Sequence, residues 1–248
     1  MRKILIGISL FLILGGVAFA QEVIPWGEVY YKYAYVHIEK LRIGMESLIS
    51  FGKENGVDVS KLESLKDDFL TKSKELESAC SEKNWDEVEK IEEDMKGIVE
   101  SFKEESKKSF TGKKGARSAL RKAYDENLSY LQDLLKSARE LHKQRNLSLF
   151  DYAVSRAEEV IQKLKDYGKD TSLCEKKLSE IKAKRDNFES KMENVISSCA
   201  TIYHLSCTST TGETSCDSSV SAYCSLKNEL ENDFSELQDL IYQSAGIK

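Results

Sequence analysis

Apolar residues recur along most of this 248-residue chain at intervals of three and four, the spacing of a helix with one buried face. The pattern predicts an all-α protein of about seven helices, over residues 26–52, 60–83, 84–109, 116–145, 149–167, 171–205 and 217–244. The apolar seam of the sixth segment continues over its whole length, which is typical of antiparallel coiled-coil packing. We therefore expect elongated, antiparallel helical hairpins.

One short pattern occurs twice, where two of these helices meet. The copies are Gly56–Glu63 and Gly168–Glu175. In both, a glycine supplies the positive φ that often ends a helix, and a serine followed three residues later by a glutamate is a capping box for the next helix. The apolar positions keep the same phase on both flanks. We interpret this as internal duplication of a three-helix unit, although any two heptad-based hairpins share part of such a pattern.

The joints and loops predict a division of the chain after its N-terminal segment. Residues 21–112 form an N-terminal three-helix unit, residues 113–147 a connecting helix, and residues 148–248 a C-terminal three-helix unit. We expect the connecting helix to end at Asn146-Leu147-Ser148, because Ser148 can cap a following helix. The grouping of three helices is similar to spectrin-like repeats at the level of the fold.

The first 20 residues have the features of a secretory signal peptide. A charged start precedes an apolar run over residues 4–17 and the small-residue motif Ala18-Phe19-Ala20. We expect cleavage between Ala20 and Gln21, because the apolar run is shorter than the roughly 20 residues that span a bilayer. Retention as a membrane anchor is the alternative. The expected location is secreted or extracytoplasmic, at the cell surface or in the periplasm.

The charge balance argues against nucleic acid as a partner. The chain has 37 Lys and Arg against 42 Asp and Glu, a net charge of −5. Loss of the first 20 residues would remove Arg2 and Lys3 and no acidic residue, which makes the chain more acidic. Nucleic-acid binding needs a basic surface, and this composition does not supply one.

Cysteines provide the most specific signal, because six of them in an exported chain predict disulfides. Cys199 and Cys207 are spaced as Cys216 and Cys224 are, symmetrically about the loop between them. In an antiparallel hairpin such positions face each other, which predicts the bridges Cys199–Cys224 and Cys207–Cys216. The layout is similar to that of twin-cysteine helical hairpins, from which only the outer-to-outer and inner-to-inner pairing is carried over.

Other roles for the cysteines remain open. Cys80 and Cys174 could form a third bridge or stay as buried free thiols. The last hairpin also offers an alternative set of zinc ligands: Cys199, His204, Cys207, Cys216 and Cys224. Their spacing lacks a tight C-x-x-C knuckle, and export favours oxidation. We therefore expect disulfides, with no metal and no other cofactor.

Two further segments are candidates for surface contacts. The first expected helix is rich in tyrosine: Tyr30, Tyr31, Tyr33 and Tyr35. These could present an aromatic surface to a partner, or they could be core residues and their flanks. A glycine-punctuated basic segment could contact an anionic polymer or lipid headgroups, or it could be a solvated helix junction. Its residues are Lys113, Lys114, Arg117 and Arg121.

The sequence shows no catalytic constellation. Walker A spacing, Gly-x-Ser-x-Gly and the paired Glu-x-x-His motif of di-metal bundles are all absent, and we expect no enzymatic activity. The Lys/Glu-rich segments around both joints resemble the helical hairpins of exported archaeal coiled-coil proteins of unassigned function.

The leading interpretation is an extracytoplasmic structural or interaction protein. It would act as a rigid helical spacer or adaptor that binds another protein or a cell-envelope component. The alternative is an extracytoplasmic helical-bundle module that binds a small ligand or metal. The sequence does not predict the oligomeric state.

Overall fold

The computed structural model describes residues 23–199 and 214–246, and these residues confirm the all-α prediction. Every regular element among them is a helix. They divide into two compact units, which are described separately: an N-terminal unit, Pro25–Ala138, and a C-terminal unit that begins at Arg139. The predicted signal peptide and its cleavage site at Ala20 and Gln21 lie outside the described residues.

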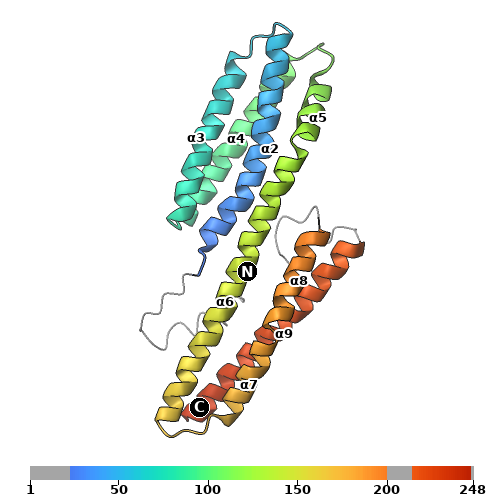
Figure 1. Ribbon diagram of the computed structural model, residues 1–248. Helices are drawn as coiled ribbons and strands as arrows, with labels where there is room; N and C mark the ends of the chain where they lie inside the picture. The colour runs from blue at the N-terminus through green and yellow to red at the C-terminus, as the bar shows by residue number, and fades with distance from the viewer. Residues whose placement is uncertain (1–22, 200–213, 247–248) are drawn as a thin grey trace. The chain divides into compact units, whose positions relative to one another are not determined.

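The N-terminal unit contains α2 (Trp26–Glu54), α3 (Ser60–Ser81), α4 (Trp85–Ser109), α5 (Ala116–Glu126) and the start of α6 (Leu128–Asp166). α3 packs against both α2 and α4, and α5 packs against α2 (Figure 1). Gly44 allows the close approach of α5, because a Cβ there would lie 2.5 Å from the Tyr124 hydroxyl oxygen. Apolar side chains from α2, α3 and α4 make up the core, including Ile49, Phe69 and Ile91.

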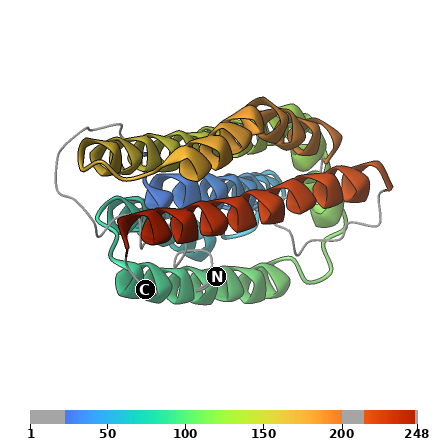
Figure 2. The same ribbon diagram turned by 90° about the horizontal axis from the view of Figure 1, so that it is seen from below.

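The C-terminal unit combines the rest of α6 with α7 (Ser172–Ala183), α8 (Arg185–Ser198) and α9 (Thr214–Ala245). Figures 1 and 2 both show α9 running beside α7 and α8, which follow one another along a single line. The core takes side chains from all three layers, including Ile161, Ile181 and Leu237. None of the helices in the described part of the chain is both long and apolar enough to cross a membrane.

The two repeated joints have the same conformation. Gly56 and Gly168 have φ of +65° and +69°. The following N–H group reaches back to a helix carbonyl in both copies, from Val57 to Gly52 at 2.9 Å and from Lys169 to Leu164 at 3.0 Å. Each joint therefore ends its helix with a Schellman-type C-cap, as the glycines predicted.

The start of the outgoing helix differs from the prediction, but in the same way in both copies. The predicted capping boxes are not the hydrogen-bonded caps here: the N-cap residues are Val59 and Thr171, which make no side-chain cap hydrogen bond. Instead Asp58 accepts hydrogen bonds from the N–H and hydroxyl of Ser60, and Asp170 does the same with Ser172.

The two glutamates of the expected capping boxes bind lysines across the joints. Glu63 pairs with Lys53 and Glu175 pairs with Lys165, so the same ion pair closes both copies. The shared pattern is Lys-x-x-Gly-x-Asp-x-Ser-x-x-Glu. A common set of contacts at two places supports internal duplication better than the shared apolar phase did.

The duplication extends to a lysine in the middle of each unit. Lys72 pairs with Asp94 of α4 at 3.1 Å, and Lys184, which stands at the equivalent distance from its joint, pairs with Asp233 of α9 at 2.6 Å. Each lysine ties the second helix of its unit to the third.

Helix boundaries depart from the prediction at four places. The helix expected over 116–145 is interrupted at Asn127, where α5 ends and α6 begins. The expected end at Asn146–Ser148 is absent, because α6 continues through it to Asp166. There Ser148 donates its hydroxyl hydrogen to the Arg145 carbonyl, a bond that a serine makes inside a helix. The helix expected over 171–205 is interrupted at Lys184 and ends at Ser198.

Candidate interaction surface

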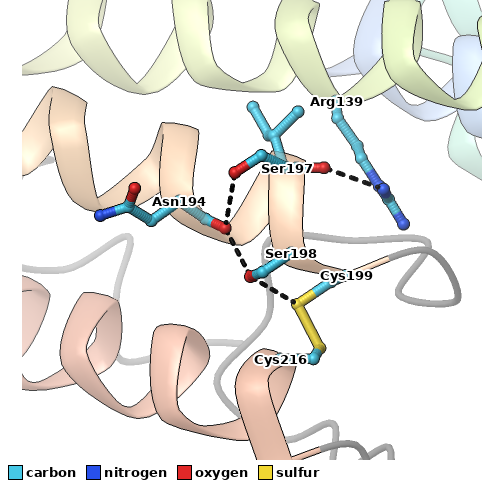
Figure 3. The surroundings of a disulfide bond; sticks show 7 residues. Arg139, Asn194, Ser197, Ser198, Cys199 and Cys216 are labelled. Carbon is cyan, nitrogen blue, oxygen red and sulfur yellow. Dashed lines mark hydrogen bonds between the residues drawn. A yellow bond between two sulfur atoms is a disulfide. The ribbon is translucent and has the colours of Figure 1, made fainter.

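A disulfide joins the end of α8 to the first turn of α9 (Figure 3). It links Cys199 to Cys216, whose Cα atoms are 4.8 Å apart. The predicted pairs Cys199–Cys224 and Cys207–Cys216 are therefore wrong. Cys224 is also disulfide-bonded, and its partner lies outside the described residues. Cys207 and His204 lie outside them as well.

The error in the pairing is an error in helix register. The contacts between α8 and α9 that fix the register are Lys184–Glu229, Phe188–Tyr223 and Cys199–Cys216. All three are centred near residue 207 of the sequence, whereas the predicted bridges were centred four residues later. The prediction assumed a helix that continued to residue 205, but α8 ends at Ser198 and Cys199 is extended, with φ of −113° and ψ of 93°.

Neighbouring polar groups satisfy the backbone at the end of α8. Ser197 and Ser198 donate hydroxyl hydrogen bonds to the Asn194 carbonyl, and Arg139 of α6 reaches the Ile196 carbonyl at 3.4 Å (Figure 3). The Ile196 carbonyl is one of the last four of α8, which have no partner within the helix, so the Arg139 contact stabilises the terminus where the disulfide begins. The disulfide also removes Cys199 and Cys216 from the alternative zinc-ligand set, because a metal ligand must be a thiolate.

The third predicted bridge, Cys80–Cys174, is also wrong. Both residues are buried free thiols, Cys80 in the core of the N-terminal unit and Cys174 in the core of the C-terminal unit. Burial and the nearby Glu92 carboxylate raise the pKa of Cys80 to about 11, so this thiol stays protonated and unreactive at neutral pH. Cys174 lies 3.5 Å from the Ser244 hydroxyl.

Aromatic side chains gather on both sides of the first half of α2. On the side of α4, Tyr30 meets Trp85 edge to face, with ring centroids 5.7 Å apart, and its hydroxyl donates to Glu92 at 2.5 Å. Trp85 remains 41 % exposed. Of the four tyrosines singled out in the sequence, Tyr33 belongs to the core and the others are half-buried.

A second aromatic group surrounds a buried carboxylate on the other side of α2. Glu39, only 5 % exposed, accepts two hydrogen bonds from Arg42 at 2.8 and 2.9 Å and one from Tyr130 at 3.0 Å. Burial alone would raise the pKa of Glu39, but the bonds from Arg42, Tyr130 and Tyr35 lower it below its usual value. The carboxylate therefore stays ionised, with its hydrogen-bonding capacity taken up by neighbours.

The tyrosines of this second group remain neutral phenols. Partial burial and the hydrogen bond to Glu39 raise the pKa of Tyr130 to about 12. Burial and the charge of Glu77 raise the pKa of Tyr31 to about 12 as well. Tyr31 also contacts the ring of Tyr35, with centroids 5.9 Å apart. Neutral, half-exposed phenols suit contact with a partner, because each has an apolar face and a polar edge. We call Tyr30, Tyr31, Tyr35, Trp85 and Tyr130 together the aromatic surface; it consists of the two groups on the two sides of α2.

The predicted basic segment forms the turn between α4 and α5 and the first turns of α5. Lys113, Lys114, Arg117 and Arg121 are all exposed. Lys113 donates to the Asn55 carbonyl of the first joint at 3.3 Å, and Arg121 pairs with Asp125 at 3.8 Å. No strongly exposed large apolar residue of the described chain lies in this segment.

Small-ligand binding within a bundle would need an enclosed hollow. A hollow of about 410 Å³ lies between α6 and α7, open to solvent. The ion pairs Lys182–Glu158 and Lys165–Glu175 cross it. The charged groups of these pairs, which line the hollow, are therefore engaged in holding α6 and α7 together.

Sequence reasoning missed several of the surface residues named above. The sequence did not single out Trp85, Tyr130 or Glu39 as candidate site residues. The signal for Glu39 is its position four residues after Tyr35 on one face of the first helix, but its partner Tyr130 is far away in sequence. Comparison with known proteins adds no assignment: no family model, no curated protein and no solved structure matches this chain.

Proposed function

We propose that this chain is a non-enzymatic, extracytoplasmic interaction protein. In this proposal two related helical units provide a rigid framework, and the aromatic surface binds another protein of the cell envelope. The observation that carries the proposal is this surface, in which Trp85 and Tyr130 stay 41 % and 40 % exposed beside half-buried tyrosines. Aromatic residues of this kind are enriched at the centres of protein interfaces.

The chemistry of the ionisable groups supports a binding role over catalysis. Glu39 is held as an ion by Arg42 and two tyrosines, so it is a poor general acid and its lone pairs are occupied. The buried Cys80 has a raised pKa, which makes it a poor nucleophile. These groups stabilise the fold, and none is placed with the base or orienting group that nucleophilic catalysis needs.

The disulfide supports the extracytoplasmic location. Disulfides persist in oxidising compartments and are rare where cellular thiols keep proteins reduced. The bond Cys199–Cys216 and the bonded state of Cys224 agree with export, which the first 20 residues of the sequence also predict.

Site-specific photocrosslinking in cells of the source organism tests this function. A photoreactive phenylalanine analogue replaces Trp85 in one variant and Tyr130 in a second. In a matched control it replaces Lys103, an exposed residue of α4 far along the helix from Trp85. The proposal predicts one discrete protein adduct from the aromatic positions and none from the control. The same adducts at all three positions, or none at either aromatic position, would contradict it.

A further inference from the structure

The most exposed large apolar side chains of the described chain lie at the second joint. Tyr167 is 81 % exposed and Leu173 is 63 % exposed. Tyr167 follows the last residue of α6, and Leu173 is the second residue of α7, so the two flank Gly168 at one hairpin end. Exposure of this degree leaves both side chains without a packing role within the fold.

The first joint has the same backbone conformation but no exposed apolar pair. Asn55 and Lys61 occupy the positions equivalent to Tyr167 and Leu173. Apolar residues near the first joint are packed instead: Phe110 is buried, and its ring meets that of Phe51 with centroids 5.6 Å apart. The joint conformation therefore does not require exposed apolar residues, and their presence at the second joint is specific to it.

Lysines surround the exposed pair. Lys163, Lys169 and Lys176 are exposed, and none makes an ion pair with another described residue. Acidic groups at the same hairpin end offset part of this charge: Glu175 pairs with Lys165, while Asp166 and Asp170 accept hydrogen bonds from the neutral Gln162 and Ser172 and keep their negative charges. The tip therefore combines two exposed apolar side chains with lysines that outnumber the neighbouring carboxylates by one: Lys163, Lys165, Lys169 and Lys176 against Asp166, Asp170 and Glu175.

We propose that the second joint docks on an anionic lipid surface, with Tyr167 and Leu173 entering the headgroup region and the lysines contacting lipid phosphates. Tyrosine favours the membrane interface, and leucine gains from burial below it. A stable protein interface buries roughly 800 Å² on each partner, more than two side chains at a hairpin end provide. A lipid surface requires no complementary shape.

The net charge of −5 does not oppose this contact. Charges separated by more than about 8 Å are largely screened at physiological ionic strength, so the lysines nearest the surface dominate. The predicted basic segment at Lys113 lacks exposed apolar neighbours, which makes it the weaker membrane contact. The proposal is independent of the protein contact assigned to the aromatic surface, so either can fail without the other.

Co-sedimentation of the purified protein with vesicles tests the proposal. One set of vesicles is phosphatidylcholine, and the other contains about one third phosphatidylglycerol. Each net positive charge near an anionic surface strengthens binding about fivefold, and the tip has an excess of one, so we expect roughly fivefold tighter binding to the anionic vesicles. The variant Tyr167→Ser/Leu173→Ser should weaken that binding at least tenfold. Lys163→Gln/Lys169→Gln/Lys176→Gln should abolish the preference for anionic lipid.

The first joint supplies the matched control. Asn55→Ser/Lys61→Ser changes the equivalent positions and should leave vesicle binding unchanged. All substituted residues are exposed, and circular dichroism checks that each variant remains folded. No binding to anionic vesicles, equal binding to both vesicle types, or unchanged binding by the Tyr167/Leu173 variant would each overturn the proposal. The last result would assign membrane contact to another part of the chain.

Discussion

The N-terminal and C-terminal units share a framework but close their second and third helices differently. In the N-terminal unit, α3 and α4 are joined by a tight turn in which Lys83 adopts φ of +59°. In the C-terminal unit, α8 and α9 are connected by a longer segment, and the disulfide Cys199–Cys216 fixes their ends. The comparison teaches that a repeated unit keeps its joint and its central Lys–Asp pair, while loops and surfaces diverge.

Surfaces diverge in the same way. The aromatic surface belongs to the N-terminal unit alone, and the exposed pair Tyr167 and Leu173 to the C-terminal unit alone. The contacts that both units share stabilise the fold. The exposed aromatic and apolar residues that occur in only one unit are not explained by fold stability. Hydrogen exchange can measure the stability of the two units separately, so substitutions at shared and unshared features test this difference.

Loss of the disulfide should have the largest effect. Cys199→Ser/Cys216→Ser should lower the free energy of unfolding of the C-terminal unit by about 3 kcal/mol, because it frees a loop closed over a sequence separation of 17 in the unfolded chain. Exchange should quicken in α8 and α9 and stay unchanged in α3 and α4. Equal acceleration in both units would show that the disulfide does not act locally.

The central Lys–Asp pairs should differ in strength. Asp233 is 9 % exposed and binds both Lys177 and Lys184. Asp233→Ala removes the buried partner that both lysines share and leaves them only the more exposed Glu236 and Glu229, so it should cost the C-terminal unit about 2 kcal/mol. Asp94→Ala removes a mostly solvated partner of Lys72 and should have little effect. Urea unfolding monitored by exchange checks both; a larger loss in Asp94→Ala would contradict the burial argument.

Acid should weaken the C-terminal unit through the same carboxylate. Burial would raise the pKa of Asp233, but the hydrogen bonds from Lys177 and Lys184 lower it. Because the pKa is lower in the folded state, this stability is present above the unfolded pKa of about 4 and is lost as pH falls below it. Asp233→Asn should flatten that part of the pH–stability curve, and an unchanged curve would assign the acid sensitivity to other groups.

Equivalent glycine substitutions at the two joints should cause equal losses of stability in the two units. Gly56→Ala and Gly168→Ala each place a Cβ on a residue with φ near +65°, where an L-residue costs about 1 kcal/mol. No atom lies close enough to clash, so this backbone term should account for the loss at both joints. Thermal unfolding with hydrogen exchange measures each unit. A difference of several-fold between the two variants would mean that the joints are not equivalent.

The smallest expected effect is a gain in stability rather than a loss. Lys83 is exposed and adopts the left-handed conformation that glycine tolerates. Lys83→Gly should therefore stabilise the N-terminal unit by about 0.5 kcal/mol, after allowance for the greater freedom of glycine in the unfolded chain. Denaturant titration measures the change. Destabilisation would show that the Lys83 side chain makes a contact worth more than the backbone strain.

Local signals predicted much of this fold. Apolar spacing identified the helices, and Gly56 and Gly168 located both joints, because the residues that determine these features are close in sequence. The helix end predicted at Asn146-Leu147-Ser148 was wrong. The two polar residues can continue a helix, because Leu147 between them is buried in the core. The interruption at Lys184 coincides with the lysine that binds Asp233, a contact that local patterns do not reveal.

Long-range features were less predictable. Disulfide pairing depended on where α8 ended, and a difference of a few residues there changed every partner. Assignment of Cys80 and Cys174 required knowing that each packs into the core of a different unit. The hydrogen bonds around Glu39 join α2 to α6. Glu39 and Tyr130 are 91 residues apart in sequence, so sequence spacing alone does not indicate this contact.

Disulfide mapping tests the central claim, that this is an oxidised scaffold built from one repeated unit. The protein is isolated from the source organism without reductant, its free thiols are blocked, and its peptides are identified by mass spectrometry. The account predicts a peptide linking Cys199 to Cys216, with Cys80 and Cys174 recovered as blocked thiols. A bridge between Cys80 and Cys174 would contradict the separate cores of the two units. Six free thiols would contradict the extracytoplasmic scaffold itself.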